Sequence, residues 1–374
     1  MFTGLKIVEL ASVLAGPSVG QFFAELGAEV IKIENLLSGG DVTRSWKVPG
    51  EKVDDRSAYF CSCNWGKKSV ALDLKTSRGK EVVQKLTSQS DIVIASYKPG
   101  DAQSLGVSYE QLATTNPELI YGQITGYGPD NDRVGYDAVI QAEAGYMDLN
   151  GEKDGPPLKM PIAMIDILAG HQLKEGLLLA MLKKEKTKKG SFVEVSLIQT
   201  AIASLANQAT NWLMTNQLPV RKGSQHPNIA PYGASFETRD GKRILLAVGN
   251  DKQFRNLMML LGHVEVASAP AYSSNQERVV NRTNLNDILA KLILKEDSMV
   301  LLPRLHSAKI PAGLIQNVKE VFDLPEAKEL LIQSHDLKGV KNFVALPSGW
   351  RTKQLLPPPR FGEHTEEILK ILFG

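Results

Sequence analysis

The stretch LKIVELASVLAGPSVGQFFAELGAEVIKIE, residues 5–34, decides the fold class. Residues 5–10 are rich in apolar and β-branched side chains, which is typical of a strand, and a turn follows them. Pro17 suits the first turn of a helix, where its missing N–H costs nothing, and Gly27 suits the end of that helix. Residues 28–34 again have strand character. A strand, a helix and a second strand within about 30 residues predict the beginning of a parallel sheet.

The same alternation continues along the first half of the chain. Strand character returns at residues 69–74, 91–95, 119–125 and 190–196, and residues 76–88 have the pattern of a helix. Strands that alternate with helices form parallel sheets with helices on both faces. The sequence therefore predicts an α/β fold with a doubly wound, Rossmann-like parallel sheet.

A second domain is predicted where this alternation ends. Residues 220–232 are rich in Gly, Pro, Ser and Asn and have the composition of a linker or an active-site loop. Residues 233–249 have the pattern of a hairpin. We predict a large Rossmann-like domain built from residues 1–219 and 325–374. Residues 220–324 are predicted to form a smaller α+β domain with its linkers.

Composition restricts the class of protein. Apolar residues make up 43% and charged residues 22% of the 374, which excludes general disorder. Lys and Arg number 43 against 41 Asp and Glu, so no basic excess points to nucleic acid or to a membrane surface. We expect neither a secretory signal nor a transmembrane helix, since no apolar run reaches ~18 residues. The two cysteines, Cys61 and Cys63, exclude a disulfide framework and suit a cytoplasmic protein.

Several common kinds of site are absent from the sequence. The six histidines do not occur at metal-binding spacings, so we predict no metal site. The chain lacks the Gly-x-Ser-x-Gly elbow of hydrolases, a Walker phosphate loop and the Gly-x-Gly-x-x-Gly fingerprint of Rossmann dehydrogenases. The turn at residues 16–20, GPSVG, opens a helix, and it either holds a phosphate there or is purely structural.

Asp166 is a candidate catalytic residue. It lies in the mostly apolar stretch MPIAMIDILAGH, residues 160–171, which we interpret as a strand-to-helix junction. Two interpretations are open, because aspartate at a helix start is commonly an N-cap. A carboxylate held in apolar surroundings by N–H groups can also be a nucleophile, since desolvation raises its reactivity. The small side chains at Ala169 and Gly170 would let a substrate approach.

Lysines follow several of the predicted strands. Lys67, Lys68 and Lys75 lie at strand edges, and Lys98 lies in the loop YKPG at residues 97–100. Loops at the carboxyl ends of parallel strands are where ligands bind in such sheets. These lysines are either ordinary solvated side chains or the binding groups for a phosphorylated ligand.

A set of short motifs, each weak alone, makes the chain recognisable. In chain order they are LAGP at 14–17, LGAEVIKIE at 26–34, GDVTR at 40–44, KSVALDLK at 68–75, GYD at 135–137, Asp166, HPNIAPY at 226–232 and GEHT at 362–365. In this order and spacing the chain resembles the family III coenzyme A transferases, the group of formyl-CoA transferase and the carnitine CoA-transferases. 2-Methylacyl-CoA racemase is a relative of this group.

The resemblance implies an enzyme that moves CoA from an acyl-CoA thioester to a carboxylic acid. Both are substrates, and CoA is not a resident cofactor. Asp166 matches the family nucleophile. It would attack the acyl-CoA carbonyl to give a mixed anhydride, and the CoA thiolate would then convert this to an aspartyl-CoA thioester. The acceptor acid would run the same steps in reverse.

The resemblance also implies the residues that contact CoA. They are Leu14 and Ala15, at the adenine end; Leu72, Asp73, Leu74 and Lys75; Ser96, Tyr97 and Lys98, near the phosphates or pantetheine; and Tyr136 and Asp137, near the nucleophile. Asn35 and Ser104 stand where arginines often occur, so Lys98 or Arg44 would have to replace some diphosphate contacts. The chain lacks the long Gly-rich loop of formyl-CoA transferase, which argues against formate or oxalate as the acid.

Functions other than CoA transfer also remain open. A racemase needs a histidine acid/base where this chain has Tyr136, and His171 is a weaker substitute. A non-catalytic CoA-binding protein would not need the intact Asp166. The family resemblance further implies an interlocked homodimer. The extended segments 220–232 and 346–361 are long enough to link one body to another in such a dimer.

Overall fold

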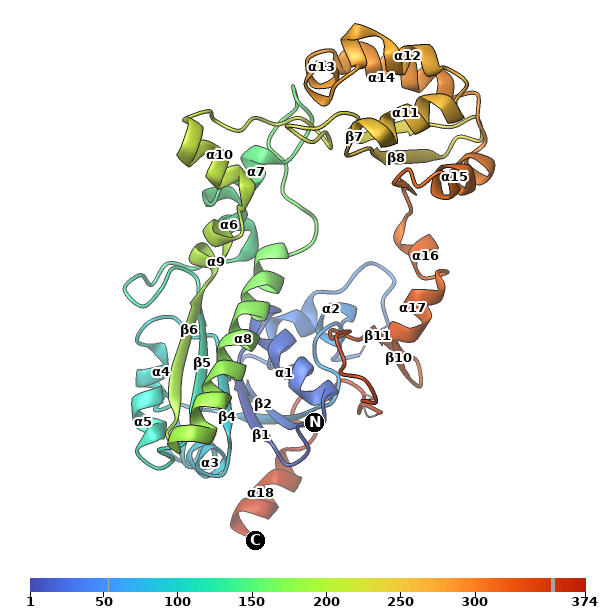
Figure 1. Cartoon of the computed structure of the whole chain (residues 1–374). Coiled ribbons are helices and arrows are strands. Elements are labelled where there is room, and N and C mark those ends of the chain that lie inside the picture. Colours follow the sequence, from blue (N-terminus) through green and yellow to red (C-terminus); the bar gives the residue numbers. More distant parts are fainter. Residues whose placement is uncertain (53, 351–353) are drawn as a thin grey trace. The chain divides into compact units, whose positions relative to one another are not determined.

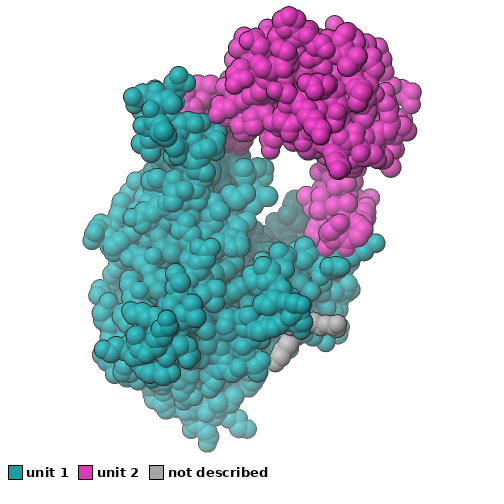
Figure 2. Space-filling view, in the orientation of Figure 1, with its two compact units in different colours: residues 1–146, 159–217, 328–374 teal, residues 147–158, 218–327 magenta. Residues whose placement is uncertain are grey.

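The computed structural model describes residues 1–52, 54–350 and 354–374 (Figure 1). The chain divides into two compact units (Figure 2). Unit 1 comprises residues 1–146, 159–217 and 328–374, and unit 2 comprises residues 147–158 and 218–327. Sequence reasoning did not indicate that residues 147–158 leave the first unit. Part of the predicted extended segment 346–361, residues 351–353, lies outside the described residues.

Unit 1 is built on a six-stranded sheet in which every pair of neighbours is parallel. Its strands are β1 (Lys6–Leu10), β2 (Glu29–Asn35), β3 (Lys67–Leu72), β4 (Ile92–Ala95), β5 (Ile120–Thr125) and β6 (Ser191–Ser196). Their order is β3-β2-β1-β4-β5-β6, so the direction of winding reverses between β1 and β4. The predicted α/β fold with a doubly wound parallel sheet is confirmed.

Helices cover both faces of this sheet, because its strands are apolar on both sides. The helices of unit 1 are α1 (Ala15–Glu25), α2 (Ala58–Cys61), α3 (Ser77–Ser88), α4 (Asp101–Ser104), α5 (Tyr109–Ala113), α6 (Asp137–Glu143), α8 (Met164–Thr187), α9 (Leu197–Ala203), α10 (Asn207–Thr215) and α18 (Thr365–Phe373), with the 3-10 turn η1 (Val42–Ser45). The short helices α7 (Tyr146–Leu149) and α17 (Pro325–Leu330) lie at the unit boundaries. A hairpin of β10 (Leu331–Ser334) and β11 (Leu337–Val340) precedes the last helix.

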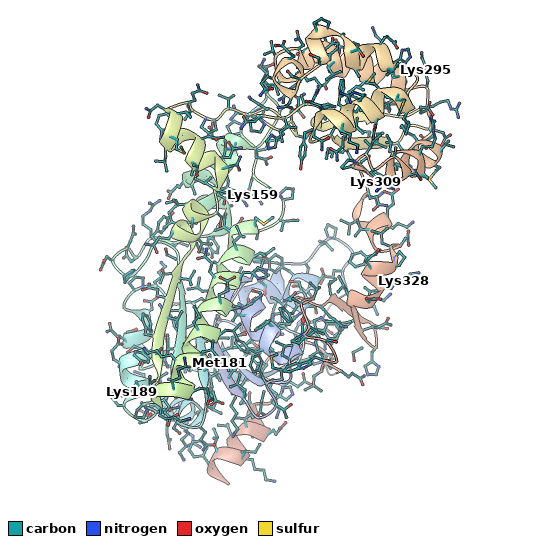
Figure 3. All side chains as sticks on the ribbon, viewed as in Figure 1. Lys159, Met181, Lys189, Lys295, Lys309 and Lys328 are labelled. Atoms are coloured by element: carbon teal, nitrogen blue, oxygen red, sulfur yellow. The ribbon has the colours of Figure 1, made fainter. Side chains whose placement is uncertain are left out.

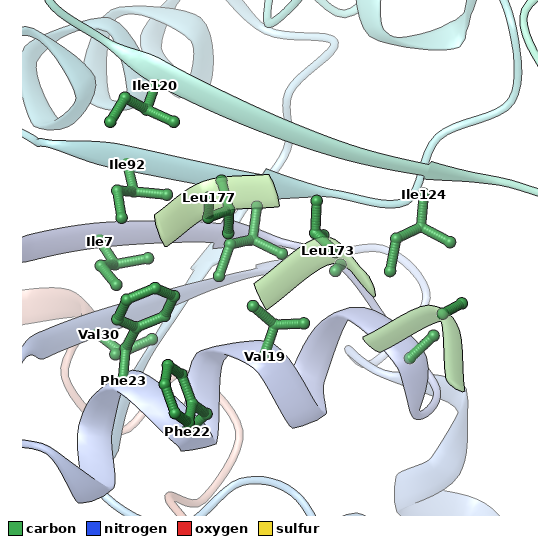
Figure 4. Close-up of a cluster of buried hydrophobic side chains, with 14 of the residues drawn as sticks. Ile7, Val19, Phe22, Phe23, Val30, Ile92, Ile120, Ile124, Leu173 and Leu177 are labelled. Atoms are coloured by element: carbon green, nitrogen blue, oxygen red, sulfur yellow. The ribbon is translucent and has the colours of Figure 1, made fainter. Parts of the chain in front are cut away.

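Successive strand residues point to opposite faces, which divides the core into two layers. Ile7 packs with α1 and α8, and Figure 4 shows this layer, with Phe23 of α1 and Leu177 of α8 among the side chains. Val8 points the other way and packs with α3, α5 and α18, for example against Val82. Apolar side chains therefore pack against the sheet on both of its faces.

Unit 2 contains a small antiparallel sheet covered by helices. The sheet is β7 (Tyr232–Glu237), β8 (Arg243–Ala247) and β9 (Ala312–Leu314), and the predicted hairpin is present as β7 and β8. The helices are α11 (Asp251–Leu260), α12 (Val264–Ser268), α13 (Asn275–Val280), α14 (Arg282–Ile293), α15 (Ser298–Ser307) and α16 (Val318–Val321), with the turn η2 (Pro270–Tyr272). Unit 2 has its own apolar core, which includes Phe236, Leu246, Phe254 and Leu289.

No helix among the described residues combines the length and the apolar character needed to cross a membrane. In the same part of the chain, no three or more His, Cys, Asp and Glu side chains gather as potential metal ligands.

Candidate active site

The candidate site lies at the carboxyl ends of the parallel strands in unit 1. In open α/β sheets, ligands bind where the strand order reverses, which here is between β1 and β4. Three cavities follow this edge, and Tyr97, in the loop after β4, lines all three. We name them after residues that line them: the Asp166 cavity, the Lys32 cavity and the Leu72 cavity. Their lining residues extend from the end of β3 to the start of α8.

The structure distributes the predicted site residues among these cavities. Ala15, Ser96, Tyr97, Lys98 and Tyr136 line the Asp166 cavity together with Asp166 itself. The segment Leu72, Asp73, Leu74 and Lys75 lines the Leu72 cavity. Leu14 is the N-cap residue of α1 and is not among the described residues that line any of the three cavities.

Asp166 is the third residue of α8, and its side chain is buried. Figure 3 labels Lys159, which precedes this helix, and Lys189, which follows its end. Residues 160–163 form a loop, so the expected strand before Asp166 is wrong. Asp166 is not the N-cap either, because Ala163 holds that position without a side-chain cap. The carboxylate is therefore not used to cap its own helix.

Asp137 caps α8 instead, from a different helix. Its Oδ2 accepts hydrogen bonds from the N–H of Ile165 at 2.7 Å and of Asp166 at 3.4 Å. Its Oδ1 accepts from Gln141 Nε2 at 2.6 Å. Asp137 is buried and is not one of the described residues that line the three cavities, so the expectation that it contacts CoA directly is not supported. Its side chain fixes the first turn of the helix that carries Asp166.

Burial raises the pKa of Asp166 to about 7, and the negative charge of Asp137 adds to the shift. Among the described residues, no lysine or arginine offsets this effect. An aspartate with this pKa is partly ionised at neutral pH, and its anion is poorly solvated. Such a carboxylate is suited to nucleophilic attack on a carbonyl carbon. Burial, followed by the charge of Asp166, also raises the pKa of Tyr59 to about 12, so that phenol stays protonated.

Arg44 does not serve as a free cation at this site. Its Nε and Nη2 bind the two carboxylate oxygens of Glu34 at 2.8 and 2.6 Å, and its guanidinium stacks on Phe60 at 3.8 Å. The suggestion that Arg44 replaces a diphosphate-binding arginine is therefore wrong. Lys98 is exposed and lines the Asp166 cavity, and Asn35 lines the Leu72 cavity.

His171 lies on a different side of α8 from Asp166. Five residues at 3.6 per turn separate the two side chains by about 140° around the helix axis. His171 is exposed, and none of the described residues that line the Asp166 cavity is a histidine. The described residues of this cavity thus offer no imidazole for an α-proton transfer.

Sequence reasoning missed two polar side chains of the Asp166 cavity, Asn131 and Arg133. Both lie in a loop whose ends meet at Gly126 and Gly135. A Cβ added at Gly135 would lie 2.5 Å from the Cα of Gly126, so these two backbones touch and close the loop. The guanidinium of Arg133 lies 4.4 Å from the ring centroid of Tyr127 and pairs with Glu143. The sequence signal for this loop was the pair Gly126 and Gly135, which flank a polar segment directly after a strand.

The chain is similar to several known proteins over nearly its whole length. The family model described as CoA-transferase family III matches residues 2–365. A succinate–glutarate CoA-transferase of Agrobacterium fabrum is 36% identical, covering 98% of this chain and 94% of its own length. A succinyl-CoA:glutarate CoA-transferase of Homo sapiens is 34% identical, with coverages of 98% and 85%. The crystal structure of a CaiB/BaiF family protein from Brucella suis matches with a TM-score of 0.87 and 38% identity, over 99% of this chain and 98% of that one.

Proposed function

The chain belongs to family III of the CoA-transferases and is an enzyme that transfers CoA, and we propose that Asp166 carries the CoA during transfer. The observation that carries this proposal is a buried carboxylate, with pKa raised to about 7, in a cavity at the switch point of the sheet. Ligands of open α/β sheets bind at such a point. Asp166 thus combines the right place with the right reactivity.

The proposed reaction has four steps that need no added oxidant or metal. The Asp166 carboxylate attacks the thioester carbonyl, the C–S bond breaks, and CoA leaves as a thiolate. The thiolate attacks the Asp166 carbonyl of the resulting anhydride and releases the first carboxylate, which leaves an aspartyl-CoA thioester. An acceptor carboxylate then attacks this thioester, and the released thiolate takes the acceptor's acyl group from Asp166. The enzyme ends with its free carboxylate.

The start of α1 supports these steps by its position. Ala15 and Gly16 line the Asp166 cavity, and the first N–H groups of a helix have no acceptor inside that helix. Each tetrahedral intermediate carries an oxyanion that needs such donors, and the loss of one donor typically slows acyl transfer by about 10²–10³-fold.

The row of cavities supports one orientation of CoA. We place the adenine end at Leu72–Lys75 and lead the pantetheine arm past Tyr97 to Asp166, because Tyr97 lines all three cavities. Ala15 shares the cavity of Asp166, so in this orientation it lies at the thioester end. The expectation that Leu14 and Ala15 serve the adenine end is replaced by this assignment.

We further propose that the acids exchanged are short dicarboxylates of the succinate and glutarate type. The relatives from Agrobacterium fabrum and Homo sapiens carry these acids in their names. Two cationic side chains line the cavity that contains Asp166. Arg133 is already paired with Glu143, so the exposed Lys98 is the better candidate to bind a carboxylate of the substrate. A cation there can attract the second carboxylate of the substrate while the first one reacts.

The test is a matrix of CoA donors and acceptor acids. Succinyl-CoA with glutarate should give glutaryl-CoA with little net loss of thioester, measured by liquid chromatography and mass spectrometry. Butyrate is the matched acceptor without a second carboxylate and should react more slowly. If every pair of donor and acid gives hydrolysis to free CoA and no new thioester, the chain does not transfer CoA between acids.

Racemisation is the alternative reaction, and the geometry around Asp166 disfavours it. Tyr136 lines the Asp166 cavity and stands at the sequence position where the resemblance places the acid/base histidine of the racemases. His171 is exposed and is not among the described residues that line this cavity. Incubation of a 2-methylacyl-CoA in deuterated water should therefore give no α-proton exchange above background. Rapid exchange that depends on His171 would reverse this ranking.

We also propose that two chains form an interlocked homodimer. Large apolar side chains are exposed on α10 in the single chain, among them Leu213 at 76% and Met214 at 79%, and a partner chain would cover them. An interlocked pair would bury far more than the ~1,600 Å² of a standard interface. Sedimentation at nanomolar concentration should therefore show only the dimer, and an active monomer would contradict the proposal.

A further inference from the structure

Val13 has a backbone conformation that valine rarely adopts. Its φ is +71°, in the left-handed region, and its branched Cβ makes that region especially unfavourable. Val13 follows β1 and lines the Asp166 cavity. Strained residues of this kind persist only where surrounding groups enforce them, and they concentrate at functional sites. The groups that hold Val13 are therefore informative.

Asp41 holds the Val13 turn through its carboxylate. The N–H of Val13 lies 3.3 Å from both Asp41 oxygens. Asp41 also accepts hydrogen bonds from the N–H and the hydroxyl of Thr43, at 3.0 and 2.8 Å. The ammonium of Lys32 lies 3.0 Å from Asp41 Oδ2 and completes the set. Asp41 thus joins the strained turn to the core of the sheet.

The same network fixes the backbone on both sides of Val13. Lys32 Nζ donates to the carbonyl of Ala11 at 2.6 Å and to Glu9 Oε1 at 3.0 Å. Lys67 Nζ binds the other oxygen of Glu9 at 2.7 Å and donates to the carbonyl of Pro17 at 2.8 Å. Glu9, Lys32 and Lys67 are all buried. The ammonium groups of Lys32 and Lys67 therefore fix the backbone just before α1 and in its first turn.

The first turn of α1 packs directly against the helix that carries Asp166. A Cβ added at Gly170 of α8 would lie 2.6 Å from Ser18 Oγ and 3.1 Å from the carbonyl of Ala15. Gly170 comes four residues after Asp166, and residues four apart lie on the same face of a helix. Asp166 thus lies on the face of α8 that meets the start of α1, and a shift of the Val13 turn would move the backbone opposite the nucleophile.

We infer that Asp41, charged and held by Lys32, is a positioning residue for acyl transfer at Asp166. It holds Val13 in the left-handed conformation and so keeps the backbone of residues 13–16 in place against the reacting carbonyl. This inference rests on the proposed role of Asp166. Misplacement of a group by about 1 Å can cost 10²-fold in rate. Asp41 also lines the Lys32 cavity, but it is 4% exposed there, so its replacement by asparagine should change the KM for acyl-CoA less than it changes the rate.

The first experiment replaces the charge of Asp41 and follows single turnovers. Acyl-CoA is mixed with the protein, and the rate of label appearance on Asp166 is measured by peptide mass spectrometry. Asp41→Asn should lower this rate and kcat by about 10- to 100-fold, while the KM for acyl-CoA changes less than about 3-fold. An unchanged labelling rate in Asp41→Asn overturns the inference and leaves the role of Asp166 intact. Wild-type protein that turns over without label on Asp166 refutes the proposed function itself.

Glu25→Gln is the matched control. The Glu25 carboxylate is also fully buried on unit 1, and it accepts hydrogen bonds from the N–H of Asn342 at 2.7 Å and of Phe343 at 3.1 Å. It lies at the opposite end of α1 from the Val13 turn. Glu25→Gln should keep kcat within about 3-fold of wild type. An equal loss of kcat in Glu25→Gln and Asp41→Asn would reduce Asp41 to general structural support and overturn the inference.

The second experiment is a rescue that general structural support would not produce. Glycine adopts a φ near +70° without help, so Val13→Gly should restore part of the rate lost in Asp41→Asn, by about 3-fold or more. Lys188→Gly is the matched control, because Lys188 also has a left-handed φ, +54°, at the far end of α8. It should restore nothing. Failure of Val13→Gly to rescue, or equal rescue by Lys188→Gly, overturns the assignment of Asp41 to the Val13 turn.

Discussion

Asp41 and Asp166 are two buried aspartates on the same edge of one sheet, and the charged groups beside them differ in sign. Asp41 has a cationic neighbour, and Asp166 has an anionic one. Asp41 is 4% exposed and Asp166 is 7% exposed. Burial alone would raise the pKa of Asp41, but the ammonium of Lys32 and the hydrogen bonds from Thr43 outweigh it and hold that pKa below its usual range. Burial raises the pKa of Asp166 to about 7, and its charged neighbour, Asp137, reinforces the shift.

The difference shows which buried carboxylate can react. A compensated carboxylate is stable as an anion and a poor nucleophile, because its charge is already shared with a cation. A buried carboxylate without a nearby cation is costly to ionise, and it loses this poorly solvated charge when it attacks an electrophile. Asp41 therefore belongs to the framework that shapes the site, and Asp166 belongs to the chemistry.

The largest effect should follow from removing the nucleophile. Asp166→Asn should lower CoA transfer by about 10⁴-fold or more, because the amide cannot form the anhydride. Glu366→Gln is the control, since Glu366 is an acidic residue in the first turn of α18 that is exposed to solvent. It should leave the rate within about 2-fold. Steady-state assays of thioester exchange measure both, and substantial transfer by Asp166→Asn would remove Asp166 from the mechanism.

The two aspartates should respond oppositely when each is replaced by asparagine. Asp41→Asn breaks a buried ion pair and should lower the free energy of unfolding by about 3–5 kcal/mol at pH 8. Its lowered folded-state pKa means that this stabilisation is present above the unfolded pKa and fades only as pH falls through the folded pKa.

Asp166→Asn should instead raise the free energy of unfolding at pH 8, by about 2–4 kcal/mol. The raised pKa of Asp166 gives a contribution that is fully present below its unfolded pKa and is lost as pH rises through its folded-state pKa of about 7. The gain in Asp166→Asn should therefore shrink from pH 8 to pH 5. Urea unfolding at fixed protein concentration measures both variants, and a stability change of the same sign in both would break the comparison.

The smallest effect concerns the pH profile. The ionised form of Asp166 attacks, so kcat/KM should rise with pH through about 7. Asp137→Asn removes the neighbouring charge and keeps a hydrogen-bond acceptor for the start of α8. This substitution should shift the rise of kcat/KM to lower pH by about 0.5–1 unit, because it lowers the pKa of Asp166. A rise that does not shift would mean that burial alone sets the pKa of Asp166.

Much of the fold could be predicted from local sequence patterns. The apolar runs of β1 and β2, with Pro17 and Gly27 at the ends of the helix between them, are signals that lie within a few residues. Asp166 stood out because a charged residue interrupts an apolar segment. Glu9 and Lys32 carry the same signal, since each is a charge inside a buried parallel strand, and they went unnoticed.

The contacts that complete the site depend on tertiary structure. Asp137 caps a helix that begins 27 residues later, and no local pattern predicts that pairing. The left-handed turn at Val13 is not visible either, because valine disfavours it and the cause, Asp41, lies 28 residues away. The role of Arg44 was misjudged for a similar reason, since its partner Glu34 is brought to it by the path of the chain.

The most direct test of the account is to trap the CoA carrier. The protein is incubated with acyl-CoA, quenched with borohydride or hydroxylamine, digested and mapped by mass spectrometry, with Asp166→Asn treated in parallel. The account predicts a single modified acidic residue, Asp166, with a yield that approaches one per active site and no label in Asp166→Asn. Modification of a different residue, or full turnover with Asp166 unmodified, would contradict it.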